Sequence, residues 1–449
     1  MAYVGSGGCR VELSVCRACL PEVSGNRITV PRSLVLLDVY AGLLGESIAG
    51  FFLGLVEPRD EWVTGMVERY RFRVVAEELY SLVVDTGGLV SEARVSPLYG
   101  PARRASLLGE PYAGFYASSE DRVAGEYERI ARRAGLTSGG RVRPRLVRGA
   151  LERARIRARI VMSRIGLRIG RMARRLMETL SPYLTALRCT GGWTYDSRRY
   201  VSLPEGEYWE SPGRQVLAEL LGDEYQCSSP GVLSSSSICR SAGDRRVVLK
   251  RYASRGAKWV PASLASPSGA RFTVRAPARM AREYRMLRVL RSVVPTPGII
   301  AVIRHSEGPM MVRDFVPGTP VLSSKDPEHW RGAGMALAFI HRAGYAMLDS
   351  NPGNFLVGDD GRTWVIDAEQ AHRFTPEAGA WDLLVFAVYS LLFGADKGLV
   401  IEAFRAYREA DEDLFAELRE RALSPEISGR LMMVAYPLYH GARLLLLSV

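Results

Sequence analysis

The pattern of apolar and polar positions changes along the chain, and it divides the sequence into two differently built regions. Over residues 1 to about 185, apolar side chains recur at spacings of three and four, which predicts a mainly α-helical domain. Gly, Ser and Pro clusters near 86–112 and 136–144 interrupt this pattern. The predicted helices span Arg59–Val84, Ser119–Ala134 and Arg145–Ser181.

Residues 186–215 are rich in Gly, Ser, Pro, Trp and Tyr, and we expect a linker or bridging segment there. From residue 216 onward, a β-rich stretch (225–250) comes before a helix, two strands, a second helix, a hairpin and then helices only. The helices cover 277–292 and 330–343, and the strands cover 298–304 and 310–316. This order predicts an α+β fold, in which residues 216–449 form a small β-rich lobe and a larger helical lobe with a cleft between them.

Composition supports a folded protein of more than one domain. The chain has 449 residues, 47% of them hydrophobic and 24% charged, which favours globular structure over disorder. Its net charge is +12, and nearly all of the basic residues are arginine. Only four are lysine, so a lysine in a chemically suitable place is informative. These four are Lys250, Lys258, Lys325 and Lys397.

The six cysteines are scattered, which suits a reducing cytoplasmic interior. Cys16 and Cys19 form a CxxC motif, but no nearby Cys or His completes the four ligands of a zinc site, so zinc is the minor alternative. No signal peptide is evident. The most membrane-like stretch, Ser33–Val56, contains Asp38 and Glu46. An acidic residue near a bilayer centre costs about 2.5–3.5 kcal/mol, so a buried helix pair is the better interpretation.

Two aspartates near the C-terminal end carry the strongest chemical signal. Asp349 precedes Asn354 by five residues and Asp367 by eighteen, and apolar runs flank both sites. The runs predict two short buried strands joined by a turn at Gly358–Gly361. Phosphoryl transfer needs a carboxylate that can accept a hydroxyl proton, together with oxygen ligands for Mg²⁺. We therefore expect Asp349 as the base and Asn354 and Asp367 as metal ligands.

Lys250 and Glu283 fit the phosphate-gripping part of such a site. Lys250 ends the β-branched run Arg246-Val-Val-Leu-Lys, where it can pair with nucleotide phosphates. Glu283 lies beside the apolar face of the helix 277–292, from which it can reach Lys250. The alternatives are an ordinary edge-strand lysine and an exposed glutamate paired with a local arginine.

Two further segments are weaker candidates for nucleotide contacts. Gly231, Ser235 and Ser236 belong to a Gly- and Ser-rich turn whose backbone and hydroxyls can donate to phosphate oxygens, although it is not a GxGxxG motif. Asp314, Phe315 and Val316 end an apolar strand and can offer backbone groups to an adenine edge. A plain exit from strand to turn is equally consistent with the second segment.

From about Gly231 to Asp382, roughly a third of the chain, these residues resemble the protein-kinase-like superfamily. The resemblance is to its atypical branch, which includes RIO kinases, the KEOPS-associated kinase, the UbiB family and the aminoglycoside and lipopolysaccharide kinases. Asp349-Ser-Asn-Pro-Gly-Asn354 is similar to the DxHPGN of UbiB proteins, and Ile366-Asp-Ala-Glu-Gln is similar to the IDxxQ of RIO kinases.

The resemblance implies a role for each matched residue. Lys250 pairs with Glu283, Asp349 is the catalytic-loop aspartate, and Asn354 and Asp367 bind metal. Asp382 is the buried aspartate that holds the catalytic loop, and His341 in Phe339-Ile-His-Arg-Ala-Gly is structural.

The chain departs from the family pattern at three places. Met347 stands where the catalytic loop usually carries histidine, Glu369 replaces the glycine of the DFG position, and no APE motif is present. These departures weaken the case for ordinary protein kinase activity and leave the metal ligands and the base intact. The resulting prediction is an atypical Mg²⁺- and ATP-dependent phosphotransferase acting on an unknown hydroxyl acceptor, a protein Ser/Thr or a small molecule. The alternatives are an ATPase switch acting on an RNA or membrane partner and an ATP-binding pseudokinase scaffold.

An arginine-rich segment lies outside this constellation. Residues 141–175 contain thirteen arginines and one acidic residue, Glu152. Within the predicted helix 145–180, an apolar stripe runs beside a basic stripe, an arrangement that suits RNA phosphates or an anionic membrane surface or partner. The alternative is a domain helix whose exposed face is arginine because arginine is the dominant cation of this chain.

Overall fold

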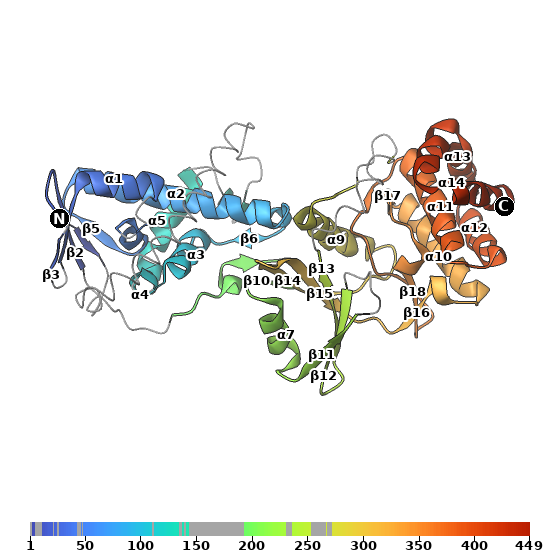
Figure 1. Cartoon of the computed structure of the whole chain (residues 1–449), viewed down its shortest axis with the longest axis horizontal. Coiled ribbons are helices and arrows are strands. Elements are labelled where there is room, and N and C mark those ends of the chain that lie inside the picture. Colours follow the sequence, from blue (N-terminus) through green and yellow to red (C-terminus); the bar gives the residue numbers. More distant parts are fainter. Residues whose placement is uncertain are drawn as a thin grey trace. The chain divides into compact units, whose positions relative to one another are not determined.

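The computed structural model describes residues 2–4, 11–20, 22–24, 27–42, 46, 48–109, 112–133, 137–138, 141–142, 193–229, 236–252, 266 and 272–449. Contacts divide the chain into two compact units, the first formed by residues 1–85 and 90–204 and the second by residues 86–89 and 205–449 (Figure 1). Residues 193–204 of the predicted bridging segment therefore belong to the first unit and 205–215 to the second. Residues 143–192, which contain the predicted helix 145–181 of the arginine-rich segment, lie outside the described residues. None of the described helices is both long and apolar enough to cross a bilayer.

The first unit combines a small sheet with helices. Its strands follow the order β3-β4-β2-β1-β5, and only the β2–β4 pair is parallel. Its larger elements are β1 (Ala2–Val4), β2 (Val11–Cys16), β3 (Glu22–Ser24), β4 (Arg27–Pro31), α1 (Arg32–Ala41), the 3-10 helix η1 (Ala49–Leu53), β5 (Val56–Pro58), α2 (Glu61–Asp85), α3 (Tyr99–Leu108), α4 (Tyr112–Ala117) and α5 (Glu120–Arg133).

The sequence predicted part of this unit. The helices expected near 59–84 and 119–134 are confirmed as α2 and α5, whereas the N-terminal sheet was not predicted. The expected helix pair at 33–56 is one α-helix followed by a 3-10 turn and a strand. Strands of three to six residues are too short for alternation to stand out, although alternate residues such as Val11 and Leu13 are buried.

A buried ion network joins α2 and α3 in this unit. Arg104 lies 2.7 Å from Glu46, 2.9 Å from Glu77 and 2.8 Å from Glu78. Nearby, the carboxylate of Asp38 accepts the backbone N–H groups of residues 46, 48 and 49 at 2.8–2.9 Å. Glu46 is therefore ion-paired and Asp38 is hydrogen-bonded inside the protein, as buried charges must be. These are the two acidic residues that argued against a membrane span.

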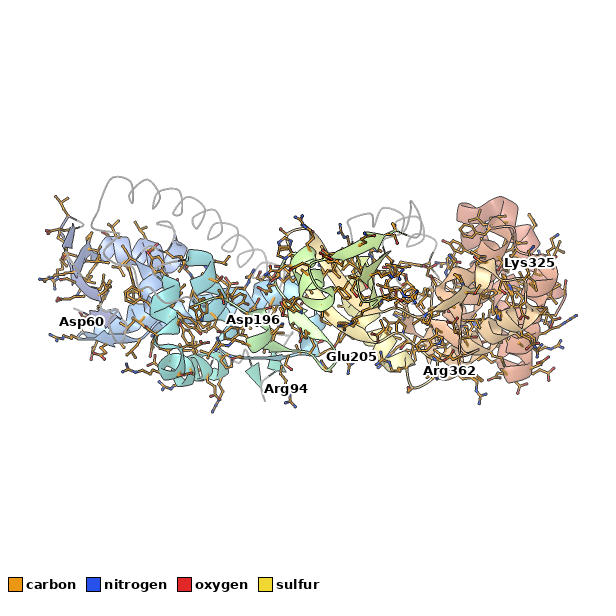
Figure 2. All side chains as sticks on the ribbon, turned by 90° about the horizontal axis from the view of Figure 1, so that it is seen from below. Asp60, Arg94, Asp196, Glu205, Lys325 and Arg362 are labelled. Carbon is orange, nitrogen blue, oxygen red and sulfur yellow. A yellow bond between two sulfur atoms is a disulfide. The ribbon has the colours of Figure 1, made fainter. Side chains whose placement is uncertain are left out.

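The second unit begins with a sheet whose strands follow the order β11-β12-β13-β15-β14-β10. Glu205, labelled in Figure 2, opens the unit, and its carboxylate accepts the N–H of Ile299 at 2.8 Å. Helix α7 (Gly213–Leu221) covers one face through Val216 and Leu217, while α9 (Ala276–Leu290) contacts the other side through Glu283. The strands are β10 (Glu207–Trp209), β11 (Tyr225–Ser228), β12 (Ser236–Ser241), β13 (Arg246–Arg251), β14 (Ile299–His305) and β15 (Gly308–Asp314).

A helical part completes the second unit, as predicted. Its helices are α10 (Pro327–Arg342), α11 (Pro376–Leu392), α12 (Lys397–Ala410), α13 (Glu412–Leu423) and α14 (Pro425–Leu447). Asp326 and Thr375 cap α10 and α11 by accepting N–H groups of the first turn, and a proline follows each cap. Between these two helices, β18 (Phe355–Gly358) and β19 (Thr363–Val365) form the predicted hairpin. Arg362, labelled in Figure 2, stands at the end of its turn.

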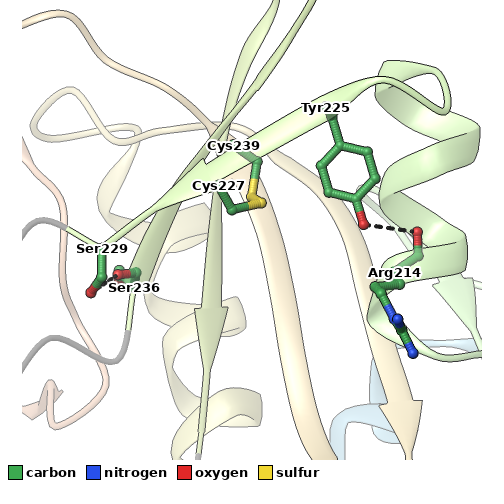
Figure 3. The surroundings of a disulfide bond; sticks show 6 residues. All are labelled: Arg214, Tyr225, Cys227, Ser229, Ser236 and Cys239. Atoms are coloured by element: carbon green, nitrogen blue, oxygen red, sulfur yellow. Dashed lines mark hydrogen bonds between the residues drawn. A yellow bond between two sulfur atoms is a disulfide. The ribbon is translucent and has the colours of Figure 1, made fainter.

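The described cysteines are paired rather than free. Cys16 and Cys19 form a disulfide, which removes the thiolates that a zinc site would need. Cys227 and Cys239 form a second disulfide across β11 and β12, where they are direct partners in the register with Cα atoms 4.1 Å apart (Figure 3). The sequence-based expectation of reduced cysteines does not agree with these two disulfides. Cys227 and Cys239 are separated by 12 in sequence, and they meet only after the hairpin folds.

Candidate active site

Lys250 is buried near the end of β13, on the side of the sheet that meets α9. Its ammonium donates to Glu283 Oε2 at 2.7 Å and to Asp367 Oδ2 at 2.6 Å. Glu369 Oε2 lies 3.4 Å away. Leu249 next to it belongs to the core cluster under α7, as strand alternation requires. An ordinary edge-strand lysine is thereby excluded, and the cation lies among three carboxylates.

Glu283 is fully buried in the middle of α9 and accepts three hydrogen bonds. Its Oε2 accepts from the Lys250 ammonium and from the Tyr252 hydroxyl, the latter at 2.6 Å. Its Oε1 accepts from Nη1 of Arg313 at 2.6 Å. The alternative of an exposed glutamate is wrong, because the helix turns this carboxylate toward the sheet instead of toward water.

Asp367 follows β19 and is fixed by backbone contacts on both sides. The Ile366 N–H donates to the Asn354 carbonyl at 3.0 Å, and Nη1 of Arg313 donates to the Ile366 carbonyl at 2.6 Å. The Glu369 N–H donates to Asp367 Oδ1 at 3.0 Å. These bonds leave the Asp367 carboxylate between Lys250 and the loop that carries Asn354.

The loop from Met347 to Asn354 holds the predicted base in a defined turn. Nδ2 of Asn354 donates to the Asp349 carbonyl at 2.8 Å, which joins the two ends of the predicted acceptor and metal segment. Leu348, directly before Asp349, has φ 57°, a left-handed conformation that a bulky residue adopts only when its surroundings impose it. Trp381 Nε1 donates to the Leu348 carbonyl at 3.1 Å and is one of the contacts that hold this turn.

Asp382 anchors the same loop from inside α11. Its Oδ2 accepts the Met347 N–H at 2.6 Å and lies 3.0 Å from His341 Nε2. Its backbone carbonyl accepts the Ser350 hydroxyl at 2.6 Å. The structure thus places Asp382 and His341 where the resemblance implied. Met347 contributes its backbone N–H to this anchor.

Glu369, which stands at the DFG glycine position, is buried and paired. Nη1 of Arg279 donates to both of its carboxylate oxygens, at 3.1 and 3.2 Å. The next side chain, Gln370, exchanges two hydrogen bonds with the backbone of Thr273, at 2.8 and 3.1 Å. The segment after Asp367 is therefore pinned to the α9 side of the unit by side chains that a glycine could not provide.

The charges of this cluster shift one another's pKa values. Burial lowers the pKa of Lys250, but the carboxylates of Asp367, Glu283 and Glu369 outweigh it, and the net shift is upward. Burial raises the pKa of Glu283 more than Lys250 and Arg313 lower it. Three donors converge on Glu283, so we conclude that the pair is ionised at neutral pH.

Asp367 shifts in the other direction from Glu283. Burial raises its pKa, and the charge and hydrogen bond of Lys250 lower it by more, with help from Arg313 and the Glu369 N–H. Its pKa therefore lies below 3.8. A permanently charged carboxylate is what a metal ligand requires.

Tyr389 on α11 adds a polar group near the predicted base. Burial and the Asp349 carboxylate raise the pKa of its hydroxyl to about 12. Its ring stacks on that of Phe393 with centroids 6.2 Å apart. The Tyr389 hydroxyl consequently stays protonated, and can serve as a hydrogen-bond donor, across the physiological pH range.

The donor set fits a magnesium ion. Because Nδ2 of Asn354 is used as a donor to Asp349, its amide oxygen is the atom left to bind a cation. The Asp367 side chain is 27% exposed, whereas those of Glu283 and Glu369 are 0% and 4% exposed. Among the described acidic residues, Glu283, Asp367 and Glu369 bring carboxylate oxygens within 4.8 Å of one another. That cluster already surrounds the Lys250 ammonium, so the metal ligands predicted from the sequence are still Asp367 and Asn354.

Of the six weaker candidates for nucleotide contacts, the structure describes four: Ser236, Asp314, Phe315 and Val316. Ser236 is paired with Lys250 in the β12–β13 register, while Gly231 and Ser235 lie outside the described residues. The Asp314 N–H already donates to the Gly298 carbonyl at 2.9 Å, so it is not available to an adenine edge.

The other two residues of the strand exit are half-buried. Phe315 lies under the Arg246 guanidinium, which is 4.6 Å from the ring centroid. Val316 follows it, and its backbone groups remain the candidates for contacts with an adenine edge.

Sequence reasoning missed four polar residues of the site: Tyr252, Arg279, Arg313 and Tyr407. Arg313 stands in the run Met310-Met-Val-Arg-Asp, where a cation on a buried apolar strand was the available signal. Arg279 is one of five arginines between residues 279 and 291, and nothing in the sequence separates it from the others.

Comparison with known proteins agrees with this geometry. Residues 230–350 match the model of the Phosphotransferase enzyme family, APH. The second unit has an atypical protein-kinase-like fold. The matched stretch contains Lys250, Glu283 and Asp349, while Asn354 and Asp367 follow just beyond it. No curated protein matches the chain.

Solved structures give a weaker likeness. A crystal structure of WbdD is 17% identical with a TM-score of 0.30, covering 48% of this chain and 50% of that one. A second structure, described as the bifunctional kinase-methyltransferase WbdD, is 16% identical with a TM-score of 0.31, covering 49% and 51%. The matched part thus spans about half the length of those chains. At these scores the likeness adds nothing to the assignment of the fold.

Proposed function

We propose that this protein is a phosphotransferase that uses ATP and Mg²⁺ to move the γ-phosphoryl group to a hydroxyl acceptor. The observation that carries the proposal is the position of the Lys250 ammonium, 2.7 Å from Glu283 and 2.6 Å from Asp367. A cation held between a helix glutamate and a metal-type aspartate is the arrangement that kinase-like phosphoryl transfer needs. The match to a phosphotransferase family supports the same reaction class.

In this proposal Asp349 orients the acceptor hydroxyl and takes its proton. The acceptor oxygen forms a bond to the γ-phosphorus, the bond from that phosphorus to the bridging oxygen breaks, and ADP leaves with the electron pair. Lys250, fixed by Glu283, grips the phosphates during this step. Catalysis then rests on positioning and on charge placed in advance, because the protein contributes no covalent chemistry of its own.

Asn354 and Asp367 would hold the magnesium ion. When bound, the ion neutralises charge on the β- and γ-phosphate oxygens. The chain's own contribution is to fix these ligands, through the Asn354 bond to Asp349 and the Ile366 N–H bond to Asn354.

The test uses the purified full chain with ATP labelled on the γ-phosphate, Mg²⁺, and a panel of protein and small-molecule acceptors. Asp367→Ala and Asp349→Asn are both expected to abolish label transfer, the first by removing a metal ligand and the second by replacing the proton-accepting carboxylate with a neutral amide. The matched control is Asp360→Ala, which removes an exposed aspartate from the turn of the same hairpin. We expect the control to keep wild-type turnover.

The same experiment separates the alternatives. Label on an acceptor supports the phosphotransferase, and free phosphate alone supports an ATPase switch. If neither product forms, the result supports a pseudokinase scaffold, whether or not the protein binds nucleotide. Full activity of Asp367→Ala would refute the assignment of this site.

A further inference from the structure

Arg313 is a buried arginine on β15 that touches both halves of the proposed site. Its Nη1 atom donates to Glu283 Oε1 at 2.6 Å and to the Ile366 carbonyl at 2.6 Å. Only 5% of its surface is exposed. One atom of one side chain therefore joins the sheet, the middle of α9 and the residue immediately before Asp367.

We propose that Arg313 is a positioning residue that keeps α9 and the Asp367 segment assembled, so that the Lys250–Glu283 pair is formed with or without nucleotide. The inference rests on the proposed function for its catalytic consequence. Its structural part, a bridge from Glu283 to Ile366, stands on the contacts themselves.

Charge balance explains why a second cation is needed there. Glu283, Asp367 and Glu369 place three carboxylates around Lys250. When Lys250 also binds nucleotide phosphates, its single positive charge is shared between them and Glu283. Arg313 keeps Glu283 paired in that state, and an arginine is suited to the task because its guanidinium stays charged and rigid.

The side-chain position that forms this bridge leaves one donor of Arg313 without a hydrogen bond to any described residue. Nε of Arg313 is buried with no hydrogen-bond partner among the described residues. A buried donor without a partner costs free energy. An arginine placed only to balance charge would be expected to turn until its Nε made a hydrogen bond. Both Nη1 contacts are instead short, so the position of the side chain is set by Glu283 and Ile366.

The consequence is a site assembled without an activation segment. The stretch after Asp367 has no APE motif, and Glu369 and Gln370 pin it to Arg279 and Thr273. Arg313 also binds Glu283 of α9. The Lys250–Glu283 pair therefore forms without a phosphorylated loop or a partner that would move α9.

The experiment compares Arg313→Met with a matched control, Arg304→Met. Arg304 is a buried arginine on the neighbouring strand β14, and its Nη1 lies 2.8 Å from Glu210. Hydrogen–deuterium exchange is measured without nucleotide on peptides covering α9 and residues 363–370. Steady-state phosphoryl transfer is then measured as a function of ATP concentration.

We expect exchange in both peptides to accelerate about tenfold in Arg313→Met and to stay at the wild-type rate in Arg304→Met. With an active wild-type protein, kcat should fall about 100-fold, because a small displacement of a catalytic group has an effect of that order, while the KM for ATP rises no more than about threefold. Arg313→Lys, which keeps a cation, should recover part of both properties.

The outcomes separate the two proposals. Exchange in Arg313→Met that matches Arg304→Met would overturn the bridge, whatever the kinetics. If Arg313→Met does not fold, Arg313→Lys decides, since wild-type exchange and kcat in that variant would also overturn it. A wild-type protein that transfers no phosphate would instead defeat the proposed function, and exchange would still report on the bridge.

Discussion

The hydroxyl of Tyr407 lies 2.7 Å from Nδ1 of His341, deep in the helical part of the second unit. The ionised Asp382 carboxylate can only accept, so Nε2 of His341 is the donor to it, and Nδ1 of the neutral ring then accepts from the Tyr407 hydroxyl. Asp382 in turn accepts the Met347 N–H of the loop that carries Asp349. A hydroxyl on α12 therefore stabilises the loop through two buried intermediates.

Removing that hydroxyl should destabilise the second unit. In Tyr407→Phe, Nδ1 of His341 loses its buried partner, and an unsatisfied buried acceptor costs about 1–3 kcal/mol. Chemical denaturation measures the loss in the free energy of unfolding. The control is Tyr225→Phe, whose hydroxyl makes an exposed 3.3 Å bond to the Arg214 carbonyl, and it should change stability by less than about 0.5 kcal/mol. Equal effects in the two variants would contradict the tautomer argument.

The stability that Asp367 contributes should depend on pH in a definite direction. Its folded pKa is lowered below 3.8, so its ionised form stabilises the fold above pH 3.8, and this contribution is lost as the pH falls through the folded pKa. Asp367→Asn should therefore be less stable than the wild type at pH 7, because the folded state favours the ionised carboxylate. The difference should shrink below pH 3.8.

Unfolding free energies at a series of pH values check this expectation. Asp359→Asn, which changes an exposed aspartate of the same hairpin, should differ little from the wild type at each pH. A difference for Asp367→Asn that stays constant down to the lowest pH at which the protein is folded would show that its carboxylate is not the source.

Gly334 should not tolerate a methyl group. A Cβ at this position in α10 would lie 1.9 Å from the Ala403 carbonyl oxygen of α12, and a backbone oxygen cannot move aside as a flexible side chain can. We expect Gly334→Ala to cost about 1–3 kcal/mol, as overpacking does. In α5, Gly125 has no described atom within 4 Å of its Cβ position. Gly125→Ala should therefore be neutral or stabilising by up to about 1 kcal/mol. Denaturation curves of both variants measure the contrast.

The two disulfides should contribute unequally to stability. Cys227 and Cys239 close a loop with a sequence separation of 12, whereas Cys16 and Cys19 are separated by 3. On loop entropy, Cys227→Ser with Cys239→Ser should lower stability by about 3 kcal/mol, and the shorter loop should contribute less. Peptide mapping without reductant shows whether each cross-link is present. A larger loss for the Cys16 and Cys19 pair would reverse the expected order.

The sequence predicted the parts of the fold and site that are encoded locally. Asp349 and Asn354 come just before one hairpin and Asp367 just after it, so their order alone indicated that they meet at the same end of that hairpin. The structure joins them through the Asn354 bond to the Asp349 carbonyl and the Ile366 bond to Asn354. The contact between Lys250 and Glu283 was also expected, because strand alternation and helix periodicity each select a face.

What the sequence could not predict depends on contacts between distant segments. Arg313 and Arg279 are two among many arginines, and only the folded unit places their guanidinium groups against Glu283 and Glu369. The N-terminal sheet was missed for a related reason. Its strands are three to six residues long and are stabilised by pairing with one another, which leaves little periodic signal in any one of them. The domain limits and the roles of the site residues stay predictions.

The disulfide between Cys227 and Cys239 also constrains the register in which β11 and β12 can pair. Side chains alternate between faces along a strand, so a slip of one residue between β11 and β12 would turn these cysteines to opposite sides. Such a misaligned hairpin could not be oxidised. The cross-link therefore fits the alignment in which Ser228 pairs with Ile238 and Ser236 pairs with Lys250 on the next strand.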